Sequence, residues 1–409
     1  MPEPVAPEKK IEKMDRRVQG IDVLRGLCII AVVLHHINLR IHFNQSAFGV
    51  MIGPAANRVL WWSGYYGVRV FFVISGFLIT SWSLQRWGSL KNLSLWQFYT
   101  MRFARIVPCL LGLLALLVIL DRAGVPRFVV SAQHTSLWRA LLAALTFHVN
   151  WLEARTGYLP AAWDVLWSLS VEEVFYVFFP LLCKWLRKEI LLIALLCGFV
   201  ILGPFARTVL THNDLWQDYG YGACMDGIAI GCLAAIVAGK ISANRIRAGK
   251  ISIDRWTRVA LRSLKVIGIL LLLLIDVFRK TAGQLKFYKA GLDVTVLEIG
   301  AALLVLAYGL EQQFGMNATP GRLARAGLIC TAPLRWFGRN SYEVYLTHML
   351  VVWPMVWAFF HFNQSLNAAP VWFVATTALA GAAGYLVARV YSEPANRKLR
   401  AKLLPATTR

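Results

Sequence analysis

The sequence predicts an all-α fold: a polytopic membrane bundle of about ten transmembrane helices, with both termini in the cytoplasm. Hydrophobic residues make up 58% of the 409 positions and charged residues only 16%, and the mean hydropathy is +0.56. Apolar stretches of membrane-spanning length therefore recur along the chain. The basic residues are also distributed unevenly between the segments that connect these stretches, which sets the predicted orientation.

Ten stretches are long enough, or nearly so, to cross the hydrocarbon core as helices. They are residues 21–39, 65–82, 105–120, 167–186, 189–206, 220–238, 264–278, 291–310, 341–360 and 371–391. A shorter run, 137–152, is interrupted by Arg139, His148 and Asn150 and is expected to be a re-entrant or interfacial helix. Residues 40–64, with glycine and proline turn residues, are expected to form an outer loop.

The net charge of +22 does not require a nucleic-acid partner. Most of the 43 Lys and Arg residues fall in segments that lie inside if the amino terminus is cytoplasmic and the crossings alternate. This is the positive-inside distribution. Several of the 16 Trp residues lie near the ends of the apolar stretches, as in an interfacial aromatic belt.

The chain is expected to form one membrane unit. Residues 1–19 are charged and lack the apolar core of a removable signal peptide, so they are expected to be a cytoplasmic segment. Residues 20–395 form the transmembrane domain, and residues 396–409 a basic cytoplasmic tail. The seven cysteines lie in or beside apolar stretches without metal-ligand or redox spacing, so we expect small apolar fillers and no metal site.

The first stretch carries Arg25, His35 and His36, none of which a lipid-facing helix needs. Eleven helical residues bring Arg25 and His36 to within about 20° of one face, roughly 16 Å apart along the axis. Ionisable groups at membrane depth usually face a bundle interior or a wet cavity and mark a functional path. The plainer alternatives are that Arg25 reaches the headgroups and that the histidines are hydrogen-bonded packing residues.

Three further arginines lie in or beside apolar stretches. Arg69, in the outer half of the second stretch, needs a partner or a ligand unless it snorkels to the interface. Arg102 and Arg105 are one helical turn apart at the cytoplasmic end of the third stretch. Two guanidinium groups on one face suit a phosphate, which arginine binds bidentately, although ordinary positive-inside flanking explains the same spacing.

Carboxylates mark two other stretches. Ser168, Glu172 and Tyr176 recur every fourth residue and so share one helix face, whereas Glu173 points about 100° away. A carboxylate inside a membrane is costly unless it is protonated or paired, so Glu172 is predicted to be a site residue. Asp226 lies in the outer half of the sixth stretch among glycines that permit close helix packing.

A polar stripe also runs along the ninth stretch. Ser341, Tyr345 and His348 recur at i, i+4 and i+7, while Glu343 points elsewhere. The stripe is either a cavity wall or a row of hydrogen-bonded packing residues.

The sequence contains no GxSxG, HExxH, P-loop or GxGxxG signature of a soluble enzyme. Six segments, taken in order, instead resemble the acyltransferase 3 family of membrane acyltransferases. They are DVLRGLCIIAVVLHH, GVRVFFVISGFLIT, FYTMRFARIVP, WSLSVEEVFY, CMDGIAIGCLAA and GRNSYEVYLTHM. One such segment would be weak evidence, but six in order, from about residue 20 to residue 395, make a specific match. The chain departs from the family pattern at Val174, where Gln is common, and at Met349, where the family has Pro.

The resemblance implies a ten-helix bundle in a bacterial-type inner membrane. Such a bundle takes an acyl group, commonly acetyl, from a cytoplasmic coenzyme A thioester and delivers it to a hydroxyl of an exported glycan, lipid or small molecule. It also implies that His36 is the essential histidine and Arg25 the basic member of its motif. Arg102 and Arg105 then correspond to the pair for the CoA-type donor, and Glu172 to the motif carboxylate.

The mechanism we expect is general-base catalysis, with neutral His36 removing the proton of the acceptor hydroxyl. Glu172 or Asp226 would orient the His36 ring, and a covalent acyl-histidine is the alternative route. The further pocket candidates are His35, Arg69, Tyr176, Ser341, Tyr345 and His348. Acetyl-CoA or another acyl-CoA would be a co-substrate, and no bound cofactor is expected.

Two other functions fit the same residues. Acylation of a lipid or an antibiotic-like small molecule uses the same chemistry on another acceptor. A proton-coupled transporter also places Arg, His and carboxylates inside a membrane. It would couple flux to a proton gradient and consume no acyl-CoA.

Overall fold

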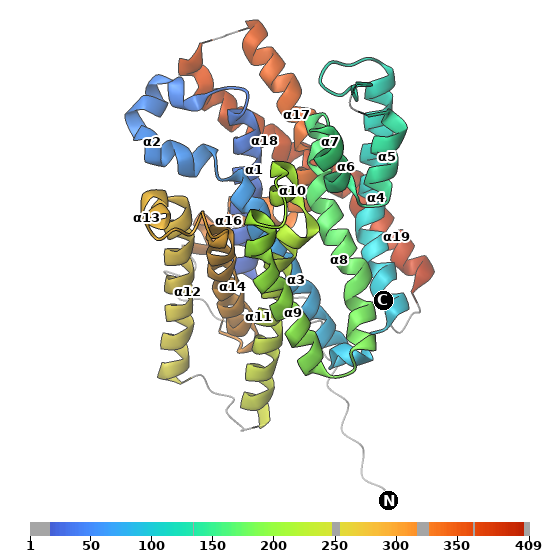
Figure 1. Ribbon diagram of the computed structural model, residues 1–409, viewed down its shortest axis with the longest axis vertical. Helices are drawn as coiled ribbons and strands as arrows, with labels where there is room; N and C mark the ends of the chain where they lie inside the picture. The colour runs from blue at the N-terminus through green and yellow to red at the C-terminus, as the bar shows by residue number, and fades with distance from the viewer. Residues whose placement is uncertain (1–16, 134, 248–253, 317–326, 363–364, 405–409) are drawn as a thin grey trace, which may run out of the picture.

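The computed structural model describes residues 17–133, 135–247, 254–316, 327–362 and 365–404, and within these ranges it contains helices and no strand. The long helices stand side by side as a bundle (Figure 1). Their bounds are α1 Gln19–Asn38, α3 Gly64–Trp87, α4 Leu95–Arg122, α8 Leu166–Trp185, α9 Glu189–Thr208, α11 Tyr221–Arg247, α12 Arg255–Asp276, α14 Leu292–Gln313, α17 Ser341–Phe362 and α18 Ala369–Val387. The all-α polytopic fold is thus confirmed.

Nine helical segments among the described residues are long and apolar enough to cross a membrane. They coincide with nine of the ten predicted stretches. The tenth, 264–278, lies in α12, which begins earlier and carries four basic residues in its first half. Those charges lower its hydropathy.

α12 nevertheless stands among the upright helices, beside α14 (Figure 1). Figure 1 shows α11 ending at the level where α12 begins and α14 beginning near the level where α12 ends. α12 also packs closely along α14, since a Cβ atom on Gly268 would lie 2.7 Å from the Gly300 carbonyl oxygen.

The expected outer loop 40–64 is wrong in part, because most of it is helical. α2, Ala47–Trp61, lies across the ends of the upright helices (Figure 1). It bends at Gly53, whose φ of 79° lies in the left-handed region that favours glycine. Pro54 follows and fits a helix start, because proline is tolerated in the first turn. The turn signals therefore marked a kink between two helical arms.

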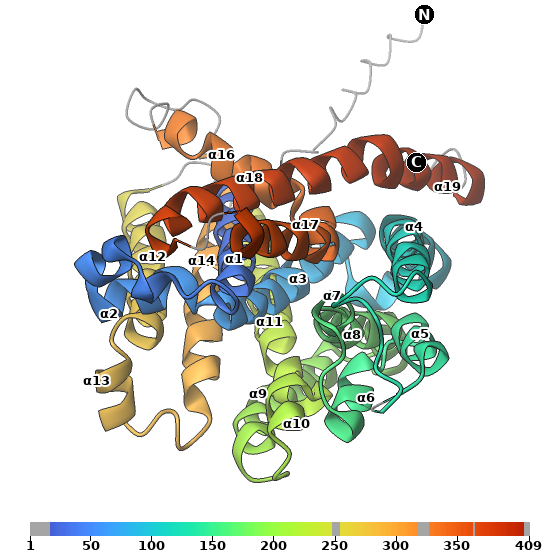
Figure 2. The same ribbon diagram turned by 90° about the horizontal axis from the view of Figure 1, so that it is seen from above.

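Short helices complete the fold. α5 Leu137–Leu145 and α6 Val149–Thr156 replace the predicted single run 137–152, and the chain breaks between them at Thr146–His148. The others are α7 Ala161–Asp164, α10 Asp214–Tyr219, α13 Arg279–Gln284 and α16 Ala332–Arg339. After α18, a π-helical turn leads into α19, Glu393–Leu403, and the three form one long rod (Figure 2).

Close helix contacts fix the position of α1 and α3. A Cβ atom on Gly76 of α3 would lie 2.0 Å from the Ile228 carbonyl oxygen of α11. A Cβ atom on Gly26 of α1 would lie 2.0 Å from the Leu334 carbonyl oxygen of α16. Small residues at such crossings let helix backbones approach within a membrane. α1 and α3 are therefore held rigidly where they line the cavity described next.

Candidate active site

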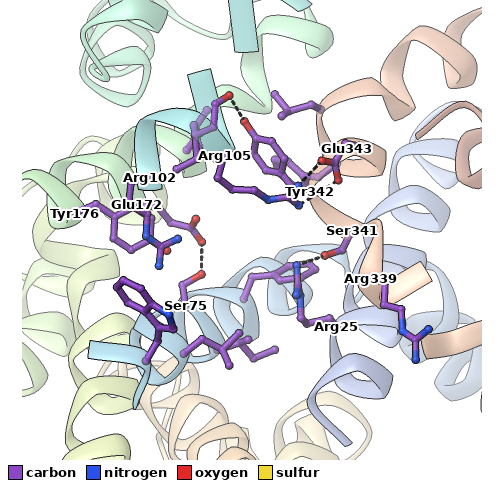
Figure 3. Close-up of a pocket in the computed structure, with 18 of the residues that line it drawn as sticks. Arg25, Ser75, Arg102, Arg105, Glu172, Tyr176, Arg339, Ser341, Tyr342 and Glu343 are labelled. Atoms are coloured by element: carbon purple, nitrogen blue, oxygen red, sulfur yellow. Dashed lines mark hydrogen bonds and ion pairs between the residues drawn. The ribbon is translucent and has the colours of Figure 1, made fainter. Parts of the chain in front are cut away.

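A cavity of about 860 Å³ opens between α1, α3, α4, α8 and α17, with α16 and α19 at its mouth (Figure 3). Its size is that of a pocket for a ligand of cofactor size. Seven arginines line it against five carboxylates. The arginines are Arg17, Arg25, Arg102, Arg105, Arg339, Arg397 and Arg400, and the carboxylates are Asp22, Glu172, Glu173, Glu343 and Glu393. The cavity therefore favours an anion.

The predicted arginines meet in this cavity from three helices. Arg25 of α1 donates a hydrogen bond to Ser341 Oγ of α17 at 2.8 Å. Arg105 of α4 pairs bidentately with Glu343, with Nη1–Oε1 and Nη2–Oε2 distances of 2.8 and 3.3 Å (Figure 3). Arg102 lies 4.3 Å from the centre of the Tyr176 ring. It makes no salt bridge within the described part of the chain, so its guanidinium is available to an external anion.

The face of α8 predicted from spacing also faces the cavity. Ser168, Glu172 and Tyr176 all line it. Glu172 Oε1 accepts a hydrogen bond from Ser75 Oγ of α3 at 2.9 Å (Figure 3). Glu173, expected to point elsewhere, is buried and lines the same cavity, because the cavity wall is wider than one helix face.

Tyr345 lies where the cavity approaches the histidines. Its hydroxyl is 2.7 Å from Ser168 Oγ and donates to the Val165 carbonyl oxygen at 3.0 Å. The Tyr345 ring contacts the His348 ring, with centroids 5.8 Å apart, and His348 contacts His36 at 5.1 Å. His36 does not line the cavity itself. Two ring contacts therefore separate His36 from the cavity.

The hydrogen bonds of the two histidines define complementary tautomers. Arg40 Nη1 lies 3.5 Å from His36 Nδ1 and donates to the His36 carbonyl oxygen at 2.6 Å. A guanidinium only donates, so His36 Nδ1 carries the lone pair and Nε2 the proton of the neutral ring. His348 Nδ1 is 2.7 Å from the Tyr345 carbonyl oxygen and so carries the proton. His348 Nε2 then has a free lone pair, buried without a partner in the described structure.

Arg40 adds a cation beside His36 that the sequence did not single out. Its guanidinium lies 4.5 Å from the centre of the Trp353 ring. Burial lowers the pKa of Arg40 to about 10, and the nearby Asp164 carboxylate opposes that shift. Arg40 therefore stays charged at neutral pH.

Asp226 and Arg69 lie apart from the cavity. Asp226 Oδ2 pairs with Arg207 Nη1 at 2.8 Å and accepts a hydrogen bond from Thr295 Oγ1 at 3.1 Å. Arg69 is fully buried and donates to the carbonyl oxygens of Ala223 and Asp218. Both belong to a polar cluster between α3, α9, α11 and α14, so the structure gives them packing partners.

His35 lies on the other side of His36. Its ring makes edge contacts with the rings of His36 and Trp62, each at a centroid distance of 5.7 Å. The start of α3 presses against it, since a Cβ atom on Gly64 would lie 2.4 Å from His35 Cβ. His35 thus links the histidine pair to the carboxyl end of α2.

Comparison with known proteins identifies the family. A family model described as an acyltransferase domain matches residues 18–389. The chain belongs to the acyltransferase 3 family. As a member of this family with nine apolar crossings among its described residues, it is a multi-pass membrane protein.

The similar proteins are named for one reaction. The peptidoglycan O-acetyltransferase OatA of Listeria monocytogenes is 26% identical over 361 residues, which cover 84% of this chain and 51% of that protein. The O-acetyltransferase OatA of Staphylococcus aureus is 24% identical over 361 residues, covering 84% and 52%. This chain therefore spans about half the length of the curated relatives it matches. No solved structure matches.

Three residues important to the geometry escaped the sequence analysis. Glu343 was set aside because it lies off the polar stripe of its helix, yet it holds Arg105 across 238 residues of sequence. Arg40 follows His36 by one helical turn, a spacing that does signal contact. Arg207, near the end of α9, was not singled out and is the partner of Asp226.

Proposed function

We propose that this protein transfers an acyl group, most simply acetyl, from a cytoplasmic acyl-CoA to a hydroxyl of an exported or cell-surface glycan, with His36 as the general base. The observation that carries the proposal is the arginine-lined cavity leading toward the His36–His348 pair. Family membership supports the reaction class. The name of the Listeria monocytogenes relative, a peptidoglycan O-acetyltransferase, supports a cell-wall glycan as acceptor.

The donor would enter at the mouth formed by α1, α16 and α19. The phosphates of a CoA-type donor would bind the arginines there and at Arg102, since arginine binds phosphate in a planar, bidentate manner. The thioester arm would extend inward past Glu172 and Ser168. Movement of the Tyr345 side chain would then open the way to His36.

In the reaction Arg40 would move off His36 Nδ1, and the acceptor hydroxyl would give its proton to that nitrogen as its oxygen attacks the thioester carbonyl carbon. Arg40, beside Nδ1, would stabilise the negative charge on the tetrahedral intermediate. The carbon–sulfur bond then breaks, and the thiolate takes up the proton. The His36 ring contacts the His348 ring, whose Nε2 has a free lone pair, so His348 would take the Nε2 proton of His36 and return a proton toward the cavity and the thiolate.

The test is acyl transfer by the purified protein in liposomes, using radiolabelled acetyl-CoA and a glycan acceptor. His36→Ala should lower transfer by about 10²- to 10⁴-fold, the usual contribution of a general base, while the protein still inserts and folds. His361→Ala, an exposed histidine of the same helix as His348, is the matched control and should keep full activity. Full activity of His36→Ala would overturn the assignment.

A second variant tests the donor site separately. Arg102→Gln should raise the KM for acetyl-CoA about tenfold or more, because a hydrogen bond to a charged group is lost, and should leave the acceptor KM unchanged. Arg258→Gln, on the exposed start of α12, is the control. Substrate flux that depends on a proton gradient, with no consumption of acetyl-CoA, would favour a transporter instead.

A further inference from the structure

A second cavity, of about 310 Å³, lies at the other end of α3 from the arginine-rich mouth. It is lined by Trp62, Tyr65, Tyr66, Arg207, Thr208, Asp218, Tyr288, Gly291, Asp293 and Val294. Tyr65 and Tyr66 belong to the first turn of α3, whereas the first cavity lies along the same helix from Val68 to its mouth near Trp82. The two cavities therefore open toward opposite ends of one helix.

The lining combines aromatic rings with carboxylates. Trp62 is 41% exposed, so part of its ring is free for a ligand. Asp218 is exposed and Asp293 half-buried, and both carry oxygens that accept hydrogen bonds from hydroxyl groups. Aromatic faces suit the apolar C–H faces of a sugar ring, while carboxylates suit its hydroxyls. An aliphatic ligand would not need the carboxylates, and an anion would be repelled by them.

The walls of this cavity are fixed before any ligand arrives. Arg69 Nε donates to the Tyr65 hydroxyl at 3.1 Å, and that hydroxyl lies 3.4 Å from Asp218 Oδ1. Arg207 Nε and Nη2 donate to the Gly291 carbonyl oxygen at 3.1 and 3.0 Å. The buried Arg69–Arg207–Asp226 cluster thus holds the walls of the second cavity in place. These residues therefore have a structural role that is separate from the donor path. A preformed wall lowers the entropy cost of binding.

Trp62 connects this cavity to the histidines. Its ring contacts His35, and His35 contacts His36, each at 5.7 Å between centroids. A ligand in the second cavity is therefore offset sideways from His36 and does not itself reach the base. A saccharide with one ring in this cavity would bring a neighbouring unit toward His36.

We infer that the second cavity is an acceptor subsite that binds one sugar ring of a saccharide whose neighbouring unit is acylated at His36. This inference rests on the proposed function and names the part of the acceptor that is recognised. The sugar is either part of a free oligosaccharide or the headgroup of a lipid-linked saccharide, since both present the same ring.

The experiment compares N-acetylhexosamine oligomers of one to four units as acceptors of the reconstituted full chain. For the wild type, the acceptor KM should fall about tenfold from the monomer to the longer oligomers, as expected for one added stacking site. Trp62→Ala and Asp293→Asn should remove this length dependence and leave the acetyl-CoA KM unchanged. Trp357→Ala replaces an exposed tryptophan outside both cavities and should keep the dependence.

A merely structural role of Trp62 gives a different result. If Trp62 only supports His35, its loss lowers kcat for the monomer and the oligomers alike, and Asp293→Asn has no effect. That pattern would overturn the subsite. So would equal acceptor KM values for all chain lengths in the wild type.

Direct binding separates this inference from the proposed function. Saturation-transfer NMR on the purified protein, without any acyl donor, should detect the tetramer and lose the signal in Trp62→Ala and Asp293→Asn. Binding without acyl transfer would refute the proposed function and retain the saccharide site. Acyl transfer without such binding would retain the proposed function and refute the saccharide site. Tighter binding of the same saccharide on a lipid tail would identify the lipid-linked source, and equal binding the free one.

Discussion

Among single residues, Glu153 is an acid whose protonation the fold controls. It is fully buried in α6, its Oε1 accepts a hydrogen bond from the Leu159 amide, and its carboxyl group also interacts with the Asp164 side chain. Burial, and then the Asp164 charge, raise the pKa of Glu153 well above its ordinary value. At a pH above the ordinary pKa of glutamate, the folded protein therefore keeps a proton on Glu153 that the unfolded chain has lost.

Glu153 consequently makes stability fall as pH rises. Between the ordinary pKa and the raised one, the folded state binds more protons than the unfolded state, so the free energy of unfolding decreases with pH. Glu153→Gln keeps an acceptor for the Leu159 amide and removes the titration. The melting temperature of the wild type should drop more between pH 5 and pH 8 than that of Glu153→Gln. Asp214→Asn, an exposed carboxylate, is the control, and parallel pH curves for wild type and Glu153→Gln would contradict the prediction.

At the scale of elements, the α3–α11 crossing depends on glycine. A Cβ atom on Gly231 would lie 2.1 Å from the Val73 carbonyl oxygen, and backbone cannot move aside as a side chain can. Gly231→Ala should therefore destabilise the protein by about 1–3 kcal/mol, the usual cost of overpacking. It should also reduce transfer, because Val73 adjoins Phe72 and Ser75 of the cavity wall.

Gly198→Ala provides the matched comparison. Gly198 lies in α9 with open space around its Cα, so an added methyl group meets nothing within 4 Å. Alanine also has the higher helix propensity, by about 1 kcal/mol. Thermal unfolding of the two variants in the same detergent should rank Gly198→Ala at or above the wild type and Gly231→Ala below it. The reverse order would show that α3 and α11 are not in the contact described.

The elements also show what a sequence can and cannot predict. Periodicity placed Ser168, Glu172 and Tyr176 on one face of α8 and Ser341 and Tyr345 on one face of α17, and all five line the cavity. That success reflects local geometry, because a helix alone fixes which residues share a face. The α2 helix was missed because glycine and proline mark a kink as readily as a turn.

Helical periodicity could not identify side-chain partners that are distant in sequence. Asp226 was expected to help orient His36 because both lie in the outer half of their helices. Depth along a helix does not say which neighbour a side chain faces, and Asp226 faces Arg207. The Arg105–Glu343 pair depends on how α4 and α17 pack, which no single stretch encodes.

For the whole molecule, one side of the bundle holds the arginines and the other the second cavity. Arg17, before α1, lines the same mouth as Arg397 and Arg400 of α19, so the two ends of the described chain meet on the donor side. The positive-inside rule predicts that this side is cytoplasmic. The proposed reaction also requires that orientation, since acyl-CoA would enter here and the acceptor would approach from the opposite side.

The native cysteines allow this orientation to be measured. Five of the seven are buried, and of the two exposed ones Cys197 lies inside the apolar helix α9, away from water. Cys330 is exposed just before α16, whose Gly338 packs against Asp22 at the start of α1, so it belongs to the donor side. A membrane-impermeant maleimide should therefore leave the wild-type chain unlabelled in intact cells and label it after permeabilisation. A double variant, Cys330→Ser with Met51→Cys, places the cysteine at an exposed position of α2 on the opposite side. It should be labelled in intact cells without permeabilisation. Labelling of Cys330 from outside would show that the bundle has the opposite orientation. The arginine-lined mouth would then face away from cytoplasmic acyl-CoA, and both the predicted topology and the donor path would be refuted.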